Sequence, residues 1–259
     1  METILFDLDD TLIIERKSAE ESFIETISQI NYPIDIDKFI KTVLEQAKEL
    51  WYKLPTINFS QKIGISSWEA LWADFDGDNF NFKELKKLSA DYRYETWYQT
   101  LIKFNINNPE VAYKLSYDFK RIRNTKHNLF PETVETLNNL KGFYKLGLIT
   151  NGAPDLQWKK INGSNIRHYF DCINISGELG FTKPDERIFL AALDSLKTTK
   201  SKTVMIGDTL KSDIKGAQNS GIKSIWVNRN KSKAEDIKPD YEITNLSEIF
   251  RIITYLSKH

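Results

Sequence analysis

The chain has 259 residues, enough for one large domain or two smaller ones, and either arrangement can bury an adequate apolar core. Basic and acidic residues number 36 each, so the formal net charge is zero, which excludes the basic surface of a nucleic-acid-binding protein and a polybasic membrane patch. One cysteine, Cys172, allows no intrachain disulfide, and with three histidines it is too few for a Cys/His zinc site.

The first predicted element is a short buried strand over residues 4–6, and it runs directly into Asp7, Asp9 and Asp10. Buried like charges raise one another's pKa and resist ionisation unless a cation or hydrogen bonds compensate them. Three carboxylates within four residues at the end of a core strand therefore indicate a functional role for this loop.

The next hundred or so residues show helical patterns one after another, and no convincing strand interrupts them. Helices are predicted over residues 18–30, 35–54, 83–104 and 108–123. A helical segment thus separates the first strand from the later ones, a pattern typical of an inserted all-α helical cap domain. We expect residues 15–125 to form this cap and residues 1–14 and 126–259 to form one α/β catalytic core.

The helical segment also contains DFDGDNFNFKE, residues 74–84, which has some features of a calcium-binding loop. Asp74, Asp76 and Asp78 fit the first three ligand positions. Glycine stands at the fourth position instead of the sixth, however, and the twelfth residue is Leu85 where glutamate is required. A polar turn between two helices is the better interpretation.

From residue 130 onward, apolar strand-like runs alternate with amphipathic helical segments. Strands are predicted over residues 145–150, 171–176, 203–207 and 222–228, with a weaker one over 241–244. Helices are predicted from Pro131 to about Gly142, over 184–196 and over 212–221, where Ser212 is a candidate N-cap and Gly221 a stop. This alternation predicts an α/β fold, a Rossmann-like doubly wound parallel sheet covered on both faces.

Polar side chains follow each of the first four predicted strands, and in open parallel sheets ligands bind outside the carboxyl ends of the strands. In chain order these residues are Asp7, Asp9, Asp10 and Thr11, then Thr150 and Asn151, then Lys183, and finally Asp208, Thr209 and Asp213. We therefore expect carboxylates, hydroxyls, an amide and one lysine to converge on one edge of the sheet.

This combination of side chains suits phosphoryl transfer. A carboxylate can attack phosphorus and form an aspartyl-phosphate, which divides one difficult step into two. Magnesium prefers one or two carboxylates plus water and substrate oxygens, and Asp7 and Asp208 can supply those carboxylates. Asp9 can protonate the leaving oxygen and afterwards activate water. Three residues can hold the non-bridging phosphate oxygens by hydrogen bonds and charge: Thr150, Asn151 and Lys183.

Four segments in this order, each after a predicted strand, resemble the four motifs of the haloacid dehalogenase (HAD) superfamily. They are DLDDTL, LITNG, the lysine within GFTKPDERIF, and GDTLKSDIKGAQNSG. The resemblance covers the first dozen residues and roughly residues 130 to 230, and it is to the phosphatase branch with a helical cap inserted after the first motif. It implies a HAD-like hydrolase, namely a magnesium-dependent phosphatase that hydrolyses a small phosphomonoester of the nucleotide or sugar phosphate class through an aspartyl-phosphate.

The resemblance also implies a catalytic or substrate-binding role for five residues. Asp7 matches the nucleophile and Asp9 the general acid/base. Lys183 would stabilise the nucleophile and the transferred phosphoryl group. Thr150 matches the phosphate-binding hydroxyl, and Asn151 beside it would contact the substrate.

The remaining implied roles concern the metal and its surroundings. Mg²⁺ would be bound by Asp7, Asp208 and the backbone carbonyl of Asp9. Thr11 would help to fix the catalytic loop, and Asp213 would support the network from behind the metal ligands. Asp10 matches no catalytic position of the family, so we interpret it as a solvated loop residue.

The presence of Asp9 weighs against the metal-free dehalogenases of the superfamily, which lack the acid two residues after the nucleophile. Two alternatives to a phosphatase stay open, a phosphomutase and a non-catalytic sensor. Phosphomutases keep all four motifs and differ by returning the phosphoryl group to a second hydroxyl instead of water. A non-catalytic sensor of a phosphorylated metabolite has no need of a nucleophile and an acid/base at this spacing.

The expected partner is a small phosphorylated metabolite. No run approaches the roughly 20 apolar residues that a membrane-spanning helix requires, and the first residues carry no basic stretch followed by an apolar signal core. We therefore expect a protein of the reducing cytoplasm that binds neither membrane nor nucleic acid.

Overall fold

The structure is a computed structural model that describes residues 1–234 and 236–258, and the chain divides into two compact units. The first unit contains Met1–Glu15, Asn128–Asn151 and the described chain from Ser164 onward. The second contains Arg16–His127 and Gly152–Gly163. Within the described ranges, no helix combines the length and the apolar character needed to cross a membrane.

The first unit is built on a six-stranded parallel sheet in the order β3-β2-β1-β4-β5-β6. The strands are β1 (Thr3–Phe6), β2 (Lys145–Thr150), β3 (Cys172–Ile175), β4 (Thr203–Gly207), β5 (Lys223–Val227) and β6 (Tyr241–Ile243). All six lie where the sequence predicts them. The strand order reverses between β1 and β4, which confirms the Rossmann-like doubly wound fold and marks the point where such sheets bind ligands.

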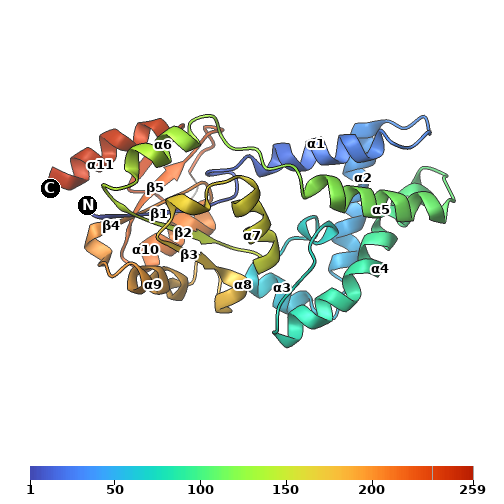
Figure 1. Ribbon diagram of the computed structural model, residues 1–259, viewed down its shortest axis with the longest axis horizontal. Helices are drawn as coiled ribbons and strands as arrows, with labels where there is room; N and C mark the ends of the chain where they lie inside the picture. Colours follow the sequence, from blue (N-terminus) through green and yellow to red (C-terminus); the bar gives the residue numbers. More distant parts are fainter. Residues whose placement is uncertain (235, 259) are drawn as a thin grey trace. The chain divides into compact units, whose positions relative to one another are not determined.

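Helices cover both faces of this sheet, as Figure 1 shows with α6 and α11 on one side and α9 and α10 on the other. The α-helices of the unit are α6 (Thr133–Leu140), α8 (Ser176–Leu179), α9 (Glu186–Ser195), α10 (Lys215–Asn219) and α11 (Ile249–Lys258). Short helical turns are η2 (Arg167–Tyr169), η3 (Lys200–Lys202), η4 (Leu210–Ile214) and η5 (Leu246–Glu248). On α9 the buried Ile188, Phe189 and Ala192 pack in one cluster with Leu5 of β1 and Met205 of β4, as their helical spacing predicts.

The start of α10 differs from the sequence prediction. Ser212 is not an N-cap: it lies inside η4, a π-helical turn, and its hydroxyl donates a hydrogen bond to Asp213 Oδ1 at 3.2 Å. The Asp213 carboxylate takes over the capping role, because its Oδ2 accepts the backbone N–H of Thr209 at 3.0 Å. The predicted stop is confirmed, since Gly221 has φ +70° just after the helix.

The second unit is helical. It contains most of α1 (Glu15–Ile27), then α2 (Ile36–Trp51), α3 (Ile57–Ile63), η1 (Glu69–Leu71), α4 (Phe80–Lys103), α5 (Pro109–Arg123) and α7 (Pro154–Gly163). The four long helices were predicted, and α3 and α7 were not. Its core is aromatic: the rings of Phe23 and Phe119 stack with centroids 4.3 Å apart, and the Trp97 ring lies 5.6 Å from that of Phe119.

Helix α7 belongs to this helical unit although it begins at Pro154, far along the chain from the first entry into the unit at Arg16. Lys160 on α7 is fully buried, and its Nζ lies 2.8 Å from Glu69 Oε1 of η1. Asp155 Oδ2 accepts the backbone N–H of Asp74 at 2.8 Å, and Lys159 pairs with the Asp74 carboxylate. The sequence interpretation assigned α7 to the segment 126–259, so its place among the other helices is a finding of the structure.

Residues 74–79 form a turn between η1 and α4, as interpreted from the sequence. The Asp74 carboxylate pairs with Lys120 as well as with Lys159, and Asp76 Oδ1 lies 2.7 Å from Lys86 Nζ. Lysines therefore already engage two of the three carboxylates that resemble calcium ligands.

Candidate active site

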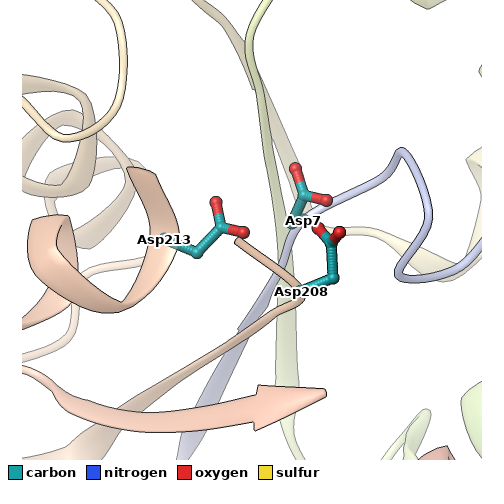
Figure 2. Close-up of side chains that lie close together, drawn as sticks. All are labelled: Asp7, Asp208 and Asp213. Atoms are coloured by element: carbon teal, nitrogen blue, oxygen red, sulfur yellow. The ribbon is translucent and has the colours of Figure 1, made fainter. Parts of the chain in front are cut away.

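Two of the predicted site residues leave neighbouring strands at the point where the strand order reverses. Asp7 follows β1 and donates its backbone N–H to the carbonyl of Ile206 on β4 at 2.9 Å. Asp208 follows β4, and because Phe6 and Ile206 are paired in register, the two carboxylates emerge side by side. Figure 2 shows the carboxylates of Asp7, Asp208 and Asp213 converging at this edge.

Lys183 lies at the centre of the site, and its side chain is only 2% exposed. Its ammonium contacts Asp7 Oδ1, lies 2.8 Å from Asp213 Oδ1, and donates a hydrogen bond to the carbonyl of Ile149 at 2.8 Å. An ammonium has three donor hydrogens, so these contacts account for all of them and fix its position.

Asp213 holds Lys183 in place from behind. Its Oδ1 contacts Lys183 and accepts the Ser212 hydroxyl, while its Oδ2 accepts the backbone N–H of Thr209. A Cβ atom at Gly207 would lie 2.4 Å from Asp213 Oδ2, so this close approach requires glycine at the end of β4. The arrangement agrees with the supporting role expected for Asp213.

Asn151 makes two hydrogen bonds to the backbone of Lys183. Its Oδ1 accepts the backbone N–H of Lys183 at 2.9 Å, and its Nδ2 donates to the carbonyl of the same residue at 3.1 Å. Both ends of the amide are therefore used to hold the loop that carries the lysine. Thr150 immediately precedes Asn151, is the last residue of β2, and is buried.

The loop after β1 turns sharply at Asp10, which has φ +57°. Its Oδ1 accepts the backbone N–H of Glu15 at 3.1 Å, so Asp10 starts α1 and is not an incidental solvated residue. Asp9 beside it is half-buried. The Thr11 hydroxyl is buried and makes no hydrogen bond with any residue in the described part of the chain.

Two residues outside the four motifs also position the site. Arg229, just after β5, donates from Nη2 to the carbonyl of Thr11 at 3.1 Å and from Nη1 to Glu132 at 2.6 Å. Trp226 donates its indole N–H to the carbonyl of Asp208 at 2.7 Å. Sequence reasoning missed both, because the only local signal was a polar or aromatic residue at the end of a predicted strand.

Negative charge exceeds positive charge in this cluster. Burial raises the pKa of the Asp7 carboxyl well above its usual range, and the charges of Asp213, Asp208 and Asp9 raise it further, against the opposing effect of Lys183. Burial, with the charges of Asp213 and Asp10, raises the pKa of Asp208 to about 7. Burial acts to lower the pKa of Lys183, but the charges of Asp213 and Asp7 outweigh it and keep the lysine cationic.

This excess of carboxylate fits a divalent cation. One carboxylate oxygen from each of Asp7, Asp208 and Asp213 lies within 4.8 Å of the other two. Hard oxygen donors of this kind suit Mg²⁺. Both oxygens of Asp213 already accept hydrogen bonds from Lys183, Thr209 and Ser212, so Asp7 and Asp208 are the carboxylates best placed to bind it directly.

The raised pKa of Asp208 predicts how the metal-free protein responds to pH. A carboxyl with a pKa near 7 when folded and near 4 when unfolded binds more protons in the folded state, so stability is lost as the pH rises through 7. Between pH 6 and 8 the loss is about 1.4 kcal/mol, which lowers the midpoint of thermal unfolding by about 3–5 °C. Thermal unfolding in EDTA at the two pH values measures it.

The matched control for this measurement is Asp208→Asn, which removes the carboxyl and keeps every other titrating group. His127 is one such group: burial lowers the pKa of its imidazole, so its contribution to stability changes with pH in the opposite direction. The variant should therefore show a smaller decline than the wild-type chain, with Asp7 as the remaining carboxyl of the site whose pKa is raised. An equal decline in both proteins would show that Asp208 does not carry the effect.

Comparison with known proteins agrees with this geometry. The family model described as haloacid dehalogenase-like hydrolase matches residues 1–221. The chain is 30% identical over 252 residues to a phosphoserine phosphatase of Thermus thermophilus, covering 96% of this chain and 98% of that protein. It is 31% identical over 185 residues to the pyrimidine 5'-nucleotidase YjjG of Escherichia coli, covering 71% and 77%. Among solved structures, the chain is similar to the HAD-hydrolase YfnB of Bacillus subtilis bound to magnesium, with a TM-score of 0.68. The two sequences are 22% identical, and the match covers 97% of this chain and 98% of YfnB.

Proposed function

The chain belongs to the haloacid dehalogenase-like hydrolase family, and we propose that it is a magnesium-dependent phosphatase that hydrolyses a small phosphomonoester through an aspartyl-phosphate on Asp7. The observation that carries this proposal is the buried Lys183, shared between Asp7 and Asp213 and placed beside Asp208 where the strand order reverses. This arrangement holds a carboxylate, a cation and a second carboxylate within reach of one phosphate group.

In the first step, an Asp7 carboxylate oxygen attacks phosphorus and the bond from phosphorus to the ester oxygen breaks. Asp9 donates its proton to the departing oxygen, so the leaving group departs as an alcohol. Lys183 remains against Asp7 and offsets the negative charge that collects on the phosphoryl oxygens. Thr150 would contact these oxygens through its hydroxyl.

In the second step, Asp9 removes a proton from a water molecule, which attacks phosphorus of the aspartyl-phosphate. The bond to Asp7 breaks, inorganic phosphate leaves and the carboxylate is restored. Asp7, Asp208 and the backbone carbonyl of Asp9 would hold Mg²⁺, which supplies positive charge to the phosphate oxygens when it is bound. Asp213 and Asn151 keep Lys183 in place throughout.

We further propose that the helical unit is the cap. It is inserted directly after the loop that carries Asp7 and Asp9, and Asp10 joins that loop to the first turn of α1 through its hydrogen bond with Glu15. A cap of this kind would close over the substrate, exclude water during the first step and set specificity. Beyond the 15–125 segment expected from the sequence, it would include α7.

The test is release of inorganic phosphate from a panel of phosphate esters, with Mg²⁺ and with EDTA. The panel contains nucleoside monophosphates, sugar phosphates and phosphoserine, because the names of the relatives span more than one substrate class. We expect release from one chemical class and a fall of at least about 100-fold in EDTA. Conversion of a sugar phosphate into its isomer without phosphate release would identify a phosphomutase, and binding without turnover would identify a sensor.

A further inference from the structure

The helical unit contains a groove of about 310 Å³ between α4 and α5, which we call the α4–α5 groove. Three basic and three tyrosine side chains line it: Arg93, Lys120, Arg121, Tyr94, Tyr113 and Tyr117. None of the described residues that line the groove is acidic. Because the whole chain has equal numbers of acids and bases, this positive charge is a local feature and does not follow from the composition.

Arg93 is the most informative of these side chains. It is half-buried on α4, and its Nη1 donates to the carbonyl of Ala73 at 2.9 Å. Within the described chain it makes no ion pair with a carboxylate. Partial burial of a guanidinium is costly, and burial lowers the pKa of Arg93 although the charge of Asp74 acts in the opposite direction. An anion in the groove would supply the missing partner and accept a forked pair of hydrogen bonds.

The other two cations lie on α5 and retain free donor capacity. Lys120 pairs with Asp74, and Arg121 Nη2 lies 3.4 Å from Asp118 Oδ1. Each of these carboxylates also pairs with a second cation: Asp74 pairs with Lys159, and Asp118 pairs with Lys114. The carboxylates of Asp74 and Asp118 therefore each face two cations, and neither residue lines the groove.

The tyrosines provide flat surfaces beside these charges. Tyr113 and Tyr117 are separated by one helical turn and lie on the same face of α5, where they are 67% and 62% exposed. Tyr94 on α4 is held by stacking on Tyr98, with ring centroids 5.7 Å apart. Exposed aromatic rings next to arginine are suited to a ligand that has both a planar ring and a negative charge.

We propose that the α4–α5 groove binds an organic anion in which a phosphate group is joined to a planar ring, of the size of a nucleoside monophosphate. The volume lies at the lower end of the range for small-molecule sites, which suits a ligand of this size. The phosphate pairs with Arg93 and Lys120, and the ring lies against the tyrosines. None of the residues in the proposed catalytic mechanism lines the groove, so this binding adds to the proposed phosphatase activity and does not depend on it.

The test is a titration with AMP in EDTA, followed through the backbone amide chemical shifts of residues 90–94 and 113–124. These amides report on the groove itself, so binding at Asp7 and Lys183 does not interfere. We expect them to shift together and to saturate, and we expect Arg93→Gln to weaken this binding at least about tenfold. Adenosine and inorganic phosphate each lack half of the ligand and should each bind at least about tenfold more weakly than AMP.

The matched control is Lys87→Gln, which removes one positive charge from α4, the helix of Arg93, at an exposed residue that does not line the groove and pairs with Glu84. The dissociation constant of this control variant for AMP should stay within about twofold of the wild-type value. Tyr117→Ser, in contrast, should weaken AMP binding without any change in charge. The proposal is overturned by an absence of shifts at about 10 mM AMP, by equal losses in Arg93→Gln and Lys87→Gln, or by inorganic phosphate binding as tightly as AMP. Tyr117→Ser keeps the test decisive if Arg93→Gln does not fold.

Discussion

Replacing Asp7 with asparagine should lower phosphate release at least about 10⁴-fold while the fold is retained. Asparagine has nearly the same shape, but its amide oxygen is a poor nucleophile and cannot form the aspartyl-phosphate. The variant should also be more stable than the wild-type chain in EDTA at pH 8, because burial and three neighbouring carboxylates oppose ionisation of Asp7. Phosphate release and thermal unfolding, measured on the same preparation, check both expectations.

A variant that is inactive and also more stable excludes misfolding as the cause of its inactivity. The matched control is Asp10→Asn, three residues along the same loop, because an asparagine at this position can still accept the backbone N–H of Glu15. It should retain activity within about tenfold of the wild-type value. Wild-type turnover in Asp7→Asn would disprove the proposed nucleophile.

The largest expected effect on stability is at the buried ion pair between Lys160 and Glu69. Glu69→Ala should lower the free energy of unfolding by about 3–5 kcal/mol, because it removes the carboxylate that lies 2.8 Å from a fully buried ammonium. The variant also loses the hydrogen bonds that Glu69 Oε2 accepts from the backbone and hydroxyl of Ser66. Urea unfolding followed by tryptophan fluorescence measures the loss.

An exposed pair at the C-terminal end of α2 provides the control. Lys53 Nζ lies 2.7 Å from Glu49 Oε1, nearly the same separation, but the two side chains are 64% and 56% exposed. Glu49→Ala should therefore cost less than about 1 kcal/mol. If Lys160 is replaced by Met and Glu69 by Leu together, much of the stability should return, since an apolar pair needs no desolvation of charge. Equal costs for Glu69→Ala and Glu49→Ala would show that burial does not set the strength of the pair.

The six strands and the four long helices could be predicted because their signals are local. A continuous run of buried apolar residues identifies β4, and apolar positions at helical spacing identify α9. Helix α7 could not be predicted in the same way. Its lysine at position 160 counts as a surface residue in any hydrophobic pattern, and the partner that allows its burial, Glu69, lies 91 residues earlier in the sequence.

Some residues of the candidate site could likewise be predicted from local signals, and others could not. Asp7, Lys183 and Asp208 could be found because parallel strands bring their carboxyl ends to one edge of the sheet. The use of Asn151 was missed, because its amide bonds to the backbone of a loop 32 residues away. Arg229 was missed for a similar reason, since its hydrogen bond to the carbonyl of Thr11 spans 218 residues and belongs to no motif.

Because α7 belongs to the helical unit, this unit cannot be exchanged between proteins as one continuous segment. The chain passes between the two units at four places, after residues 15, 127, 151 and 163, and not only at the two ends of one insertion. Excising residues 16–127 would leave Leu156 and Lys160 of α7 without the core in which they are buried. A transplant of the helical unit from another protein would therefore have to bring its own version of residues 152–163.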